Sequence, residues 1–426
     1  MIKNQMDHKF SKISIVGLGY IGLPTAAMFA SRKVEVVGVD VSKKVVDTIN
    51  RGEVHIVEPE LDIVVRTAVR EGLLRATTKP EPAEAFLIAV PTPFKGNGRE
   101  PDLSYIEAAS KAIAPVLQKG NLVVLESTSP VGATEAMAEW IAAERPDLTF
   151  PQDAGEASDI LIAHCPERVL PGKVMHELIT NDRVIGGLTA SSSERAVSLY
   201  KTFVTGTCVI ASGPRVAEMA KLTENSFRDV NIAFANELSV IADKLNIDVW
   251  ELIALANRHP RVNILQPGPG VGGHCIAVDP WFIVSSAPAE AQLIRMGREV
   301  NMDKTNWVFS KVEELIEKAD KNDIRIACLG LAFKADIDDL RQSPALEICQ
   351  SLAARADLEI LIVEPNIKVL PAPLSKSGAV LMCADGAIAQ ADIVLCLVPH
   401  TPFRELDRTL LEGKIVLDTC AVWGGL

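Results

Sequence analysis

The sequence predicts an α/β protein in which two parallel-sheet domains are joined by a helical middle domain. Three observations support this prediction. Short apolar runs alternate with helical segments in the first half, strand signals vanish between about residues 215 and 300, and strand-like runs return near the end. At 426 residues the chain exceeds the size at which one core usually keeps growing, so several domains are expected. The predicted domains are residues 1–212, 213–319 and 320–426.

The first domain contains five short apolar runs that stop where turn or polar residues begin. They are residues 12–19 (KISIVGLG), 34–40 (VEVVGVD), 85–91 (AFLIAVP), 121–128 (NLVVLEST) and 159–167 (DILIAHCPE). Strands of this length that alternate with helices are typical of a parallel sheet with helical crossovers. The first half is therefore expected to form one such sheet.

The middle domain is expected to be helical because residues 215–245 keep an unbroken helical periodicity. Residues 259–281 (HPRVNILQPGPGVGGHCIAVDPW) interrupt it with too many prolines and glycines for a regular helix. We expect an irregular loop there that carries function. Strand-like runs then return at residues 324–333, 358–365, 392–400 and 414–420, which predicts a second parallel sheet.

Composition narrows the class of protein. With 48% hydrophobic and 23% charged residues the chain is an ordinary globular protein, and a net charge of -12 argues against a nucleic-acid or membrane-surface binder. Its apolar runs are shorter than the roughly 20 residues that a membrane span needs. The first ten residues (MIKNQMDHKF) lack the apolar core of a secretory leader, and the eight cysteines form no CxxC pair. We expect a cytoplasmic protein whose cysteines are mostly buried and reduced.

A glycine pattern directly after the first predicted strand points to a dinucleotide. In Gly17-Leu-Gly-Tyr-Ile-Gly22, Gly17 permits the tight turn, Gly19 lets a pyrophosphate approach the backbone, and Gly22 lets the following helix pack closely. Because a helix-like stretch follows, the context fits a Rossmann-like domain. A flavin site, another adenosine-nucleotide site or a simple tight turn are the alternatives.

Residues at later strand ends extend this cofactor site. Asp40 closes the second strand, where its carboxylate can accept both ribose hydroxyls of adenosine and repel a 2′-phosphate, so NAD is favoured over NADP. Thr92 and Thr128 follow two further strands and should lie along the same edge of the sheet. They are candidates for the wall of the cofactor pocket, and plain turn residues are the alternative.

Cys275 differs from the other cysteines because it lies in a glycine-rich loop, where a substrate can approach the thiol. Its neighbour His274 could lower the thiol pKa or only cap the loop. A zinc site that uses His164-Cys165 and His274-Cys275 is the competing chemistry, but the spacing fits no familiar metal pattern. We therefore predict no metal.

A helix face and a strand end provide further candidates. Lys221 and Asn225 are four residues apart, and Arg228 lies on the same stripe, so a lysine and an amide could polarise one substrate oxygen. A solvated helix face is the alternative. Glu167 ends a strand of the cofactor sheet and is a candidate general base, with a plain surface glutamate as the alternative.

Six motifs together resemble the UDP-glucose and GDP-mannose dehydrogenase family, over essentially the whole chain. They are VGLGYIGLP, ESTSPVG, CPERVLPG, KLTENSFRDVN, GPGVGGHCIAVDP and FKADIDDLRQSP, in the family's order. The resemblance implies an NAD domain, a helical dimerising domain and a nucleotide-sugar domain, and hence a homodimer or a higher homo-oligomer. It further implies an NAD-dependent, two-step oxidation of the primary alcohol of a UDP-sugar to the carboxylate. UDP-N-acetyl-D-mannosamine is the favoured substrate, and another UDP- or GDP-sugar is the alternative.

The resemblance also implies roles for single residues. Cys275 would be the nucleophile, Lys221 the proton donor and acceptor beside it, and Asn225 a residue that binds or activates the reacting groups. Glu167 or Asp279 would activate the hydrolytic water. The cofactor contacts would come from Gly17, Gly19, Tyr20, Ile21, Gly22, Asp40, Thr92, Thr128 and Arg341. The substrate contacts, some of them from a neighbouring subunit, would come from Arg168, Val169, Lys221, Asn225, Arg228, His259, Arg261, Gly272, Phe333 and Lys334.

The last domain has no GxGxxG pattern, so a uridine diphosphate is a better guest there than a second dinucleotide. Lys334 and Arg341 supply local positive charge for its pyrophosphate. One departure is Cys420, which stands where we expect close relatives to carry a lysine that contacts the sugar nucleotide. A single-step hydroxyacid-type dehydrogenase and a non-catalytic NAD-sensing protein are rival functions. Neither has a use for both Lys221 and Cys275.

Overall fold

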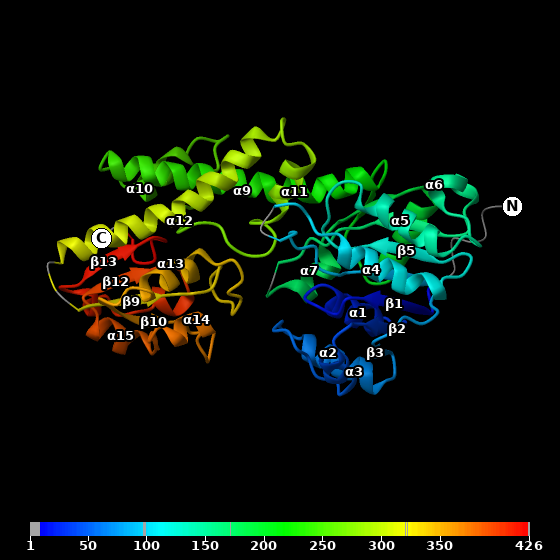
Figure 1. Cartoon of the computed structure of the whole chain (residues 1–426), viewed down its shortest axis with the longest axis horizontal. Coiled ribbons are helices and arrows are strands. Elements are labelled where there is room, and N and C mark those ends of the chain that lie inside the picture. Colours follow the sequence, from blue (N-terminus) through cyan, green and yellow to red (C-terminus); the bar gives the residue numbers. More distant parts are fainter. Residues whose placement is uncertain (1–8, 97–98, 171, 320, 322, 425–426) are drawn as a thin grey trace. The chain divides into compact units, whose positions relative to one another are not determined.

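The structure is a computed structural model that describes residues 9–96, 99–170, 172–319, 321 and 323–424 (Figure 1). The chain divides into two compact units, residues 1–223 and residues 224–426, and each is described by itself. The first eight residues, on which the expectation of no leader depends, lie outside the described ranges. Within those ranges, no helix is both long enough and apolar enough to cross a membrane.

The described part of the first unit is built on an eight-stranded sheet. In spatial order the strands are β3 (Leu74–Thr77), β2 (Glu35–Val39), β1 (Lys12–Val16), β4 (Ala85–Ile88), β5 (Leu122–Leu125), β6 (Leu161–His164), β7 (Arg183–Gly187) and β8 (Cys208–Ile210). The strands β1 to β6 pair in parallel. The order reverses between β1 and β4, and ligands of such sheets bind outside the carboxyl ends of the strands at this point.

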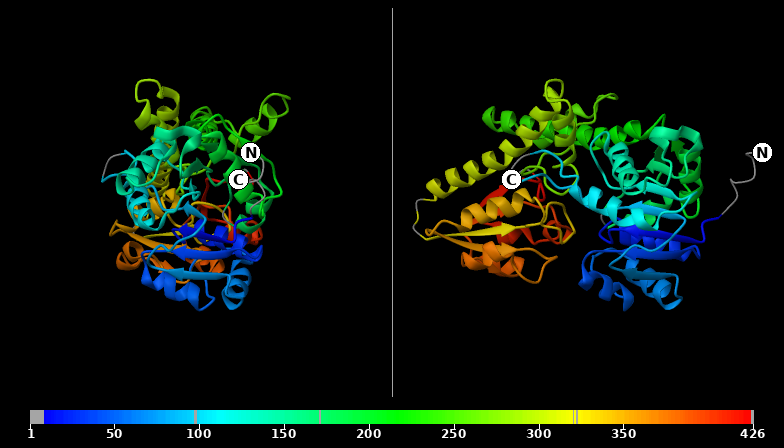
Figure 2. Two further views of the ribbon diagram at one scale, coloured as in Figure 1. Left: turned by 90° about the vertical axis from the view of Figure 1, so that its right-hand side faces the viewer. Right: turned by 45° about the vertical axis from the view of Figure 1, so that its right-hand side comes forward.

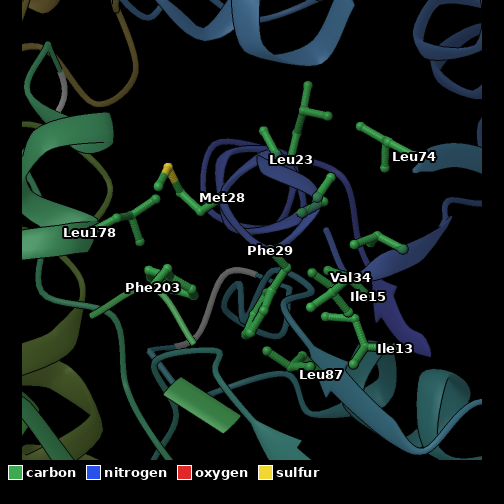
Figure 3. Packing of buried hydrophobic residues seen from close by; sticks show 14 of the residues in the cluster. Ile13, Ile15, Leu23, Met28, Phe29, Val34, Leu74, Leu87, Leu178 and Phe203 are labelled. Carbon is green, nitrogen blue, oxygen red and sulfur yellow. The ribbon is translucent and has the colours of Figure 1, made fainter. Parts of the chain in front are cut away.

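Helices cover both faces of this sheet (Figures 1 and 2). One face carries α1 (Gly22–Ser31), α2 (Lys43–Asn50), α3 (Leu61–Arg70), α7 (Val174–Thr180) and α8 (Ala190–Tyr200), and the other carries α4 (Ser104–Ile113) and α5 (Ala133–Glu144). A short helix, α6 (Pro151–Ala154), follows α5. All of α1 except Ser31 is buried, and Phe29 points from it toward the sheet, near Ile13 and Leu87 (Figure 3). The turn before α1 is therefore anchored by a helix that is packed almost all round.

The sequence prediction of this sheet was incomplete. The five predicted strands are present as β1, β2, β4, β5 and β6, but β3, β7 and β8 were missed. β7 also pairs antiparallel to β6, so the sheet is not parallel throughout. The missed strands give weak signals because β3 alternates buried and half-buried residues, β7 contains an arginine and two glycines, and β8 is only three residues long.

Between residues 215 and 300, all of which the structure describes, the only regular elements are helices, as the sequence predicted, and residues 257–278 form the irregular loop that was expected there. They are α9 (Pro214–Lys244), which begins in the first unit, α10 (Val249–Ala256), α11 (Asp279–Ser286) and the start of α12 (Gln292–Lys318). In the second unit a buried polar group joins α9 to α12. Arg298 donates to Asp229 at 2.7 Å, and the Asn301 amide donates to the Asp229 carboxylate at 2.8 Å. The long helix α12 leads into the C-terminal sheet (Figure 2).

The described part of the C-terminal sheet has five strands, all of them parallel. Their order is β11 (Val380–Leu381), β10 (Leu358–Val363), β9 (Ile324–Leu329), β12 (Ile393–Cys396) and β13 (Ile415–Asp418). One face packs on α12, α13 (Pro344–Ala353) and α14 (Ala372–Lys376), and the other on α15 (Ala384–Gln390) and α16 (Thr401–Arg404). The predicted fold class, two Rossmann-like domains with a helical middle domain, is confirmed.

Candidate active site

The glycine turn after β1 has the geometry that a dinucleotide site needs. Gly17 has a φ of +93°, and a Cβ on Gly22 would lie 1.8 Å from the Gly17 carbonyl oxygen, so both positions require glycine. A Cβ on Gly19 would meet nothing within 4 Å, which leaves open space beside the backbone. Tyr20 and Ile21 are half-buried on the same turn. The first turn of α1 carries no acidic side chain, so its positive end is available to an anion.

Asp40 lies beside this turn at the end of β2. Its Oδ2 accepts a hydrogen bond from the Leu18 backbone N–H at 3.1 Å, and its Oδ1 accepts one from Ser42 N–H at 2.8 Å. These two bonds fix the carboxylate next to the glycine turn, as a ribose-binding residue requires. His55 was missed by the sequence reasoning because it lies in a loop without a pattern. Burial lowers the His55 pKa, and the negative charge of Asp40 opposes this shift.

The neighbouring strand ends supply hydroxyl groups. Thr92 is buried, and its hydroxyl has no hydrogen-bond partner within the described ranges, so a bound group could satisfy it. Thr128 is half-buried after β5. Ser127 differs from both because its hydroxyl already donates to the Val90 carbonyl oxygen at 2.6 Å. Together with the glycine turn and Asp40, these residues fit NAD.

Glu167 is buried and held on both sides. Its Oε2 accepts from the buried guanidinium of Arg183, and its Oε1 accepts from the Arg168 backbone N–H at 2.7 Å. Glu126, at the end of β5, accepts a hydrogen bond of 3.1 Å from the Tyr200 hydroxyl. Burial, followed by the nearby Glu167 charge, raises the Glu126 pKa to about 8. This cluster could not be predicted because its members come from four separate parts of the chain: the ends of β5 and β6, the strand β7 and the helix α8.

The residues that follow Glu167 lie at the surface of the same unit. Arg168 and Val169 are half-buried, and the Arg168 side chain donates to the Asp182 carbonyl oxygen at 3.3 Å. On α9, Lys221 is half-buried and belongs to the first unit. Asn225 and Arg228, one and two turns further on, belong to the second unit; Asn225 is buried and Arg228 is exposed.

The second unit brings Cys275, Asp279 and Asn225 together. The Cys275 carbonyl oxygen accepts hydrogen bonds from Val278 N–H at 3.0 Å and Asp279 N–H at 2.8 Å, which start the turn that leads into α11. Cys275 is exposed, whereas Asp279 is buried. The Asn225 amide donates to Oδ2 of Asp279 at 2.5 Å. An accessible thiol therefore lies one helical turn from a buried, hydrogen-bonded carboxylate.

Two motifs far apart in the sequence meet at the cysteine loop. A Cβ on Gly272 would lie 2.9 Å from Phe333 Cβ, and one on Gly273 would lie 2.8 Å from the Phe333 ring. Gly273 N–H also donates to the Arg341 carbonyl oxygen at 3.2 Å. These contacts require glycines because any side chain would collide with Phe333. Lys334 is exposed next to it, and the Arg341 side chain pairs with Asp339 at 2.6 Å.

His259 and Arg261 lie in an exposed turn after α10, where His259 Nδ1 accepts from Arg261 N–H at 3.3 Å. Asn257 closes this turn through two hydrogen bonds with the backbone of Ile264, at 2.7 and 3.0 Å. Both predicted substrate residues are therefore presented outward on a closed turn.

Cys420 follows the carboxyl end of β13. Burial raises the pKa of its thiol to about 12, and the thiol donates to the Leu397 carbonyl oxygen at 3.3 Å. Beside it lies a pocket of about 360 Å³ whose lining includes Lys304, Trp307 and Asp418. Burial lowers the Lys304 pKa to about 7, and its ammonium group donates to Ser239 Oγ at 2.7 Å. Sequence reasoning missed Lys304 because α12 shows only an ordinary charged pattern.

The C-terminal sheet carries a different group where the first sheet carries Asp40. Glu364 follows β10 and is buried, and its Oε2 accepts from Leu331 N–H at 2.8 Å and Ala332 N–H at 3.1 Å. The same oxygen lies 3.0 Å from Nε2 of the fully buried His400. Since Asp336 N–H donates to His400 Nδ1 at 2.9 Å, Nε2 carries the proton and donates to Glu364. This carboxylate, unlike Asp40, is therefore hydrogen-bonded to a buried histidine as well as to the backbone.

The cysteines and the possible metal ligands matter for disulfides and for a zinc site, because a zinc site was one of the alternatives. All eight cysteines fall within the described ranges and none forms a disulfide; Cys275 and Cys383 are the exposed ones. No group of three or more His, Cys, Asp or Glu side chains in the described part of the chain could hold a metal ion. His164, one of the four residues named for the alternative zinc site, is fully buried at the end of β6.

The glycine turn with Asp40, on a doubly wound sheet, and the exposed cysteine in a second unit define the class as an NAD-binding α/β dehydrogenase. The chain belongs to the UDP-glucose/GDP-mannose dehydrogenase family. Models of the family's NAD binding domain, central domain and UDP binding domain match residues 11–204, 215–303 and 327–425. The chain is thus an NAD-dependent UDP-sugar dehydrogenase, as the sequence analysis expected.

Several relatives are similar over nearly the full length. The UDP-N-acetyl-D-mannosamine dehydrogenase of Campylobacter jejuni is 62% identical, with 94% of this chain and 98% of that protein covered. The NDP-N-acetyl-D-galactosaminuronic acid dehydrogenase of Ralstonia nicotianae is 61% identical, with 98% and 97% covered. The solved structure of a UDP-D-ManNAc dehydrogenase from Pyrococcus horikoshii has a TM-score of 0.87 and 36% identity, with 97% and 96% covered.

Proposed function

We propose that this enzyme oxidises UDP-N-acetyl-D-mannosamine at carbon 6 of the sugar to UDP-N-acetyl-D-mannosaminuronate, in two steps, with Cys275 as covalent nucleophile. The sugar is supported by the Campylobacter jejuni and Pyrococcus horikoshii relatives, both of which are UDP-N-acetyl-D-mannosamine dehydrogenases. The chemistry is supported by one observation above all: the exposed Cys275 lies one turn before the buried Asp279, which Asn225 holds by a hydrogen bond. A one-step alcohol oxidation needs no such nucleophile.

The cofactor would be held by the glycine turn of residues 17–22, by Asp40 at the ribose and by the hydroxyls of Thr92 and Thr128. When bound there, NAD would supply the hydride acceptor for the reacting carbon, with one NAD used in each oxidation. Lys221 stabilises the negative charge that develops on the substrate oxygen when the alcohol loses its proton. The second sheet would hold the uridine diphosphate, with Lys334 and Arg341 as its cations.

Cys275 acts between the two oxidations. Its thiolate adds to the carbon of the aldehyde: the C–S bond forms, the C=O π bond breaks, and the oxygen takes a proton from Lys221. The product is a thiohemiacetal with a hydrogen that can leave as hydride. Loss of that hydride and of the hydroxyl proton leaves a thioester. Water then attacks the thioester carbon, the C–S bond breaks, and the carboxylate and the thiol are released. The covalent bond also keeps the aldehyde from escaping.

We favour Asp279 over Glu167 as the group that activates this water. Asp279 is four residues from Cys275 and accepts the Asn225 amide on one oxygen. The Glu167 carboxylate, in contrast, is buried against Arg183 and bonded to the Arg168 N–H, so it is already committed to holding the strand ends. A general base must be within hydrogen-bond reach of the water proton that it takes.

We further propose a homodimer built on α9. Phe227, Phe234 and Ile241 stand seven residues apart on this helix and are 68%, 52% and 46% exposed, so they form one apolar stripe. Phe234→Lys should shift the mass measured by light scattering from dimer to monomer. A cytoplasmic location is proposed as well, because none of the eight cysteines, all within the described ranges, forms a disulfide, which suits a reducing compartment.

The test is the stoichiometry of NADH production with limiting sugar nucleotide. Two oxidations at one carbon should give two NADH per sugar, whereas a simple alcohol dehydrogenase gives one. The assay compares four substrates: UDP-N-acetylmannosamine, UDP-N-acetylgalactosamine, UDP-glucose and GDP-mannose. The galactosamine derivative is included because the Ralstonia nicotianae relative is an NDP-N-acetyl-D-galactosaminuronic acid dehydrogenase.

Variants of the cysteine separate the mechanism from the substrate. Cys275→Ala should abolish acid formation, and Cys275→Ser should accumulate a slowly hydrolysed ester that mass spectrometry detects. Cys383→Ser, at the other exposed cysteine, is the matched control and should be fully active. Undiminished uronic acid formation by Cys275→Ala would refute the covalent mechanism. A protein that binds NAD and turns over no sugar nucleotide would be a sensor.

A further inference from the structure

Glu218 makes a buried contact between the start of α9 and the N-terminus of α5. Its side chain is 1% exposed, and its carboxylate accepts three hydrogen bonds. Gly132 N–H donates to Oε2 at 2.7 Å, Thr134 N–H donates to Oε1 at 2.8 Å, and the Thr134 hydroxyl donates to Oε1 at 2.6 Å. All of these residues belong to the first unit.

The contact gives α5 the cap that its own sequence lacks. The residue before α5, Gly132, has a φ of +97° and no side chain that could accept a hydrogen bond from the first turn. Glu218 supplies the missing acceptor from another helix, at the positive end of α5, where a negative charge is favoured. Burial raises the Glu218 pKa, and the three hydrogen bonds oppose this shift.

The same contact fixes the position of Lys221. Glu218 and Lys221 are three residues apart on α9 and therefore share a face of the helix. A carboxylate held by three donors in two directions leaves little freedom for α9 to rotate or slide at this point. The segment that leads from β5 to α5, residues 126–132, contains Thr128, a proposed wall of the cofactor site, and ends at Gly132. One side chain thus connects the proposed catalytic lysine to the cofactor wall.

We propose that Glu218 is a positioning residue that sets Lys221 against the cofactor-binding sheet. This inference rests on the role proposed for Lys221. The reaction depends on the placement of the lysine to within a fraction of an ångström, because small displacements of a catalytic group lower the rate by up to about a hundredfold. The chain therefore needs a rigid connection at this position.

A second link between the same two helices provides a matched control. Arg215 pairs with Glu135 at 2.6 Å, but the Arg215 side chain is 66% exposed. Exposed ion pairs contribute little to stability and hold geometry loosely. Glu135→Gln removes one carboxylate from the α5–α9 contact, as Glu218→Gln does, but at the surface.

The first test compares steady-state kinetics. Glu218→Gln should lower kcat by about tenfold to a hundredfold and leave the KM for the sugar nucleotide within about twofold, because Lys334 and Arg341, the proposed cations of the uridine diphosphate site, are untouched. Glu135→Gln should resemble the unmodified enzyme in both. Thr134→Val removes one of the three bonds and should give a smaller loss of kcat, whereas Thr134→Ser should keep the wild-type value. Equal kcat values for Glu218→Gln and Glu135→Gln would overturn the proposal.

The second test asks whether the effect passes through the lysine. In a Lys221→Ala background, Glu218→Gln should change the residual single-turnover rate by less than about twofold, because there is no lysine left to misplace. Its effect on the free energy of unfolding should persist. A purely structural role would lower the rate by the same factor in both backgrounds and would contradict us. Wild-type turnover of Lys221→Ala alone would refute the proposed function instead.

Discussion

The amide of Asn225 on α9 donates a hydrogen bond of 2.5 Å to the carboxylate of Asp279 at the start of α11. The two residues are 54 positions apart in the sequence, and both are buried. The bond fixes which oxygen of Asp279 is occupied and which direction the carboxylate faces. It joins a helix of the middle segment to the turn that carries Cys275.

Asn225→Ala should lower kcat by about tenfold or more, because the Asp279 carboxylate loses the hydrogen bond that orients it. A tenfold loss corresponds to about 1.4 kcal/mol of transition-state stabilisation. It should also lower the free energy of unfolding by about 1 to 3 kcal/mol, since a buried carboxylate loses a donor. The comparison is Asn231→Ala on the same helix, whose amide bonds only the Phe227 carbonyl oxygen. Rate measurement and urea denaturation of both variants test this, and equal losses would argue against a special role for Asn225.

Asp40→Ala should narrow the preference for NAD over NADP. In the unmodified enzyme the Asp40 carboxylate should favour NAD over NADP by about 1 to 3 kcal/mol. NADP cannot donate the ribose 2′-hydroxyl hydrogen bond, and the carboxylate repels its 2′-phosphate. Values of kcat/KM for both cofactors measure the change. Asp47→Ala, whose carboxylate pairs with Lys43 on the exposed face of α2, should leave the preference unaltered. Equal use of both cofactors by the unmodified enzyme contradicts the assignment of Asp40.

Glu126 should make the protein less stable as the pH rises. Burial raises its pKa from 4.5 to about 8, so the folded state binds a proton that the unfolded state releases between these values. Stability from this group is therefore complete below about pH 4.5 and is lost as the pH rises through 8. Glu126→Gln should be the more stable protein at pH 9, by roughly 2 kcal/mol or more, and similar to the wild type at pH 5. Urea denaturation at both values measures the difference, and an unchanged difference across the range would disprove it.

Cys420→Ser should retain turnover. The Cys420 thiol stays protonated near neutral pH, because burial raises its pKa to about 12. The thiol donates a hydrogen bond to the Leu397 carbonyl oxygen and lies 3.4 Å from the Thr419 hydroxyl. A serine hydroxyl can donate the same bond. A kcat within about twofold of the wild type is expected, with a KM that changes modestly. A large loss of turnover would show that this residue takes part in the chemistry.

The sequence allowed the fold to be predicted where one strand is one apolar run. Thus β1, β4 and β5 were predicted, whereas β3 and β8, which mix polar with apolar residues or are very short, were missed. The antiparallel direction of β7 depends on how its connection packs, and no local pattern encodes it.

The candidate site shows the same division. Helical spacing placed Lys221 and Asn225 on one face, and the glycines marked the loop of Cys275. The partners of these residues could not be predicted, because the Asp279, Phe333 and Glu218 contacts join segments that are distant in the chain and that carry no pairing signal. Charge counts likewise gave no indication that Glu167 would be paired with Arg183 inside the protein.

In each sheet a carboxylate follows the second strand in chain order, Asp40 after β2 and Glu364 after β10, but the two carboxylates have different partners. Asp40 is proposed to bind the ribose of a ligand. Glu364 and His400 instead hold the loop of residues 331–336 against the rest of the domain by hydrogen bonds within the chain. Inserting glycines alone would therefore do little to make the C-terminal domain bind a second dinucleotide. The histidine would have to be removed first, and with it the fastening that keeps Phe333 under the cysteine loop.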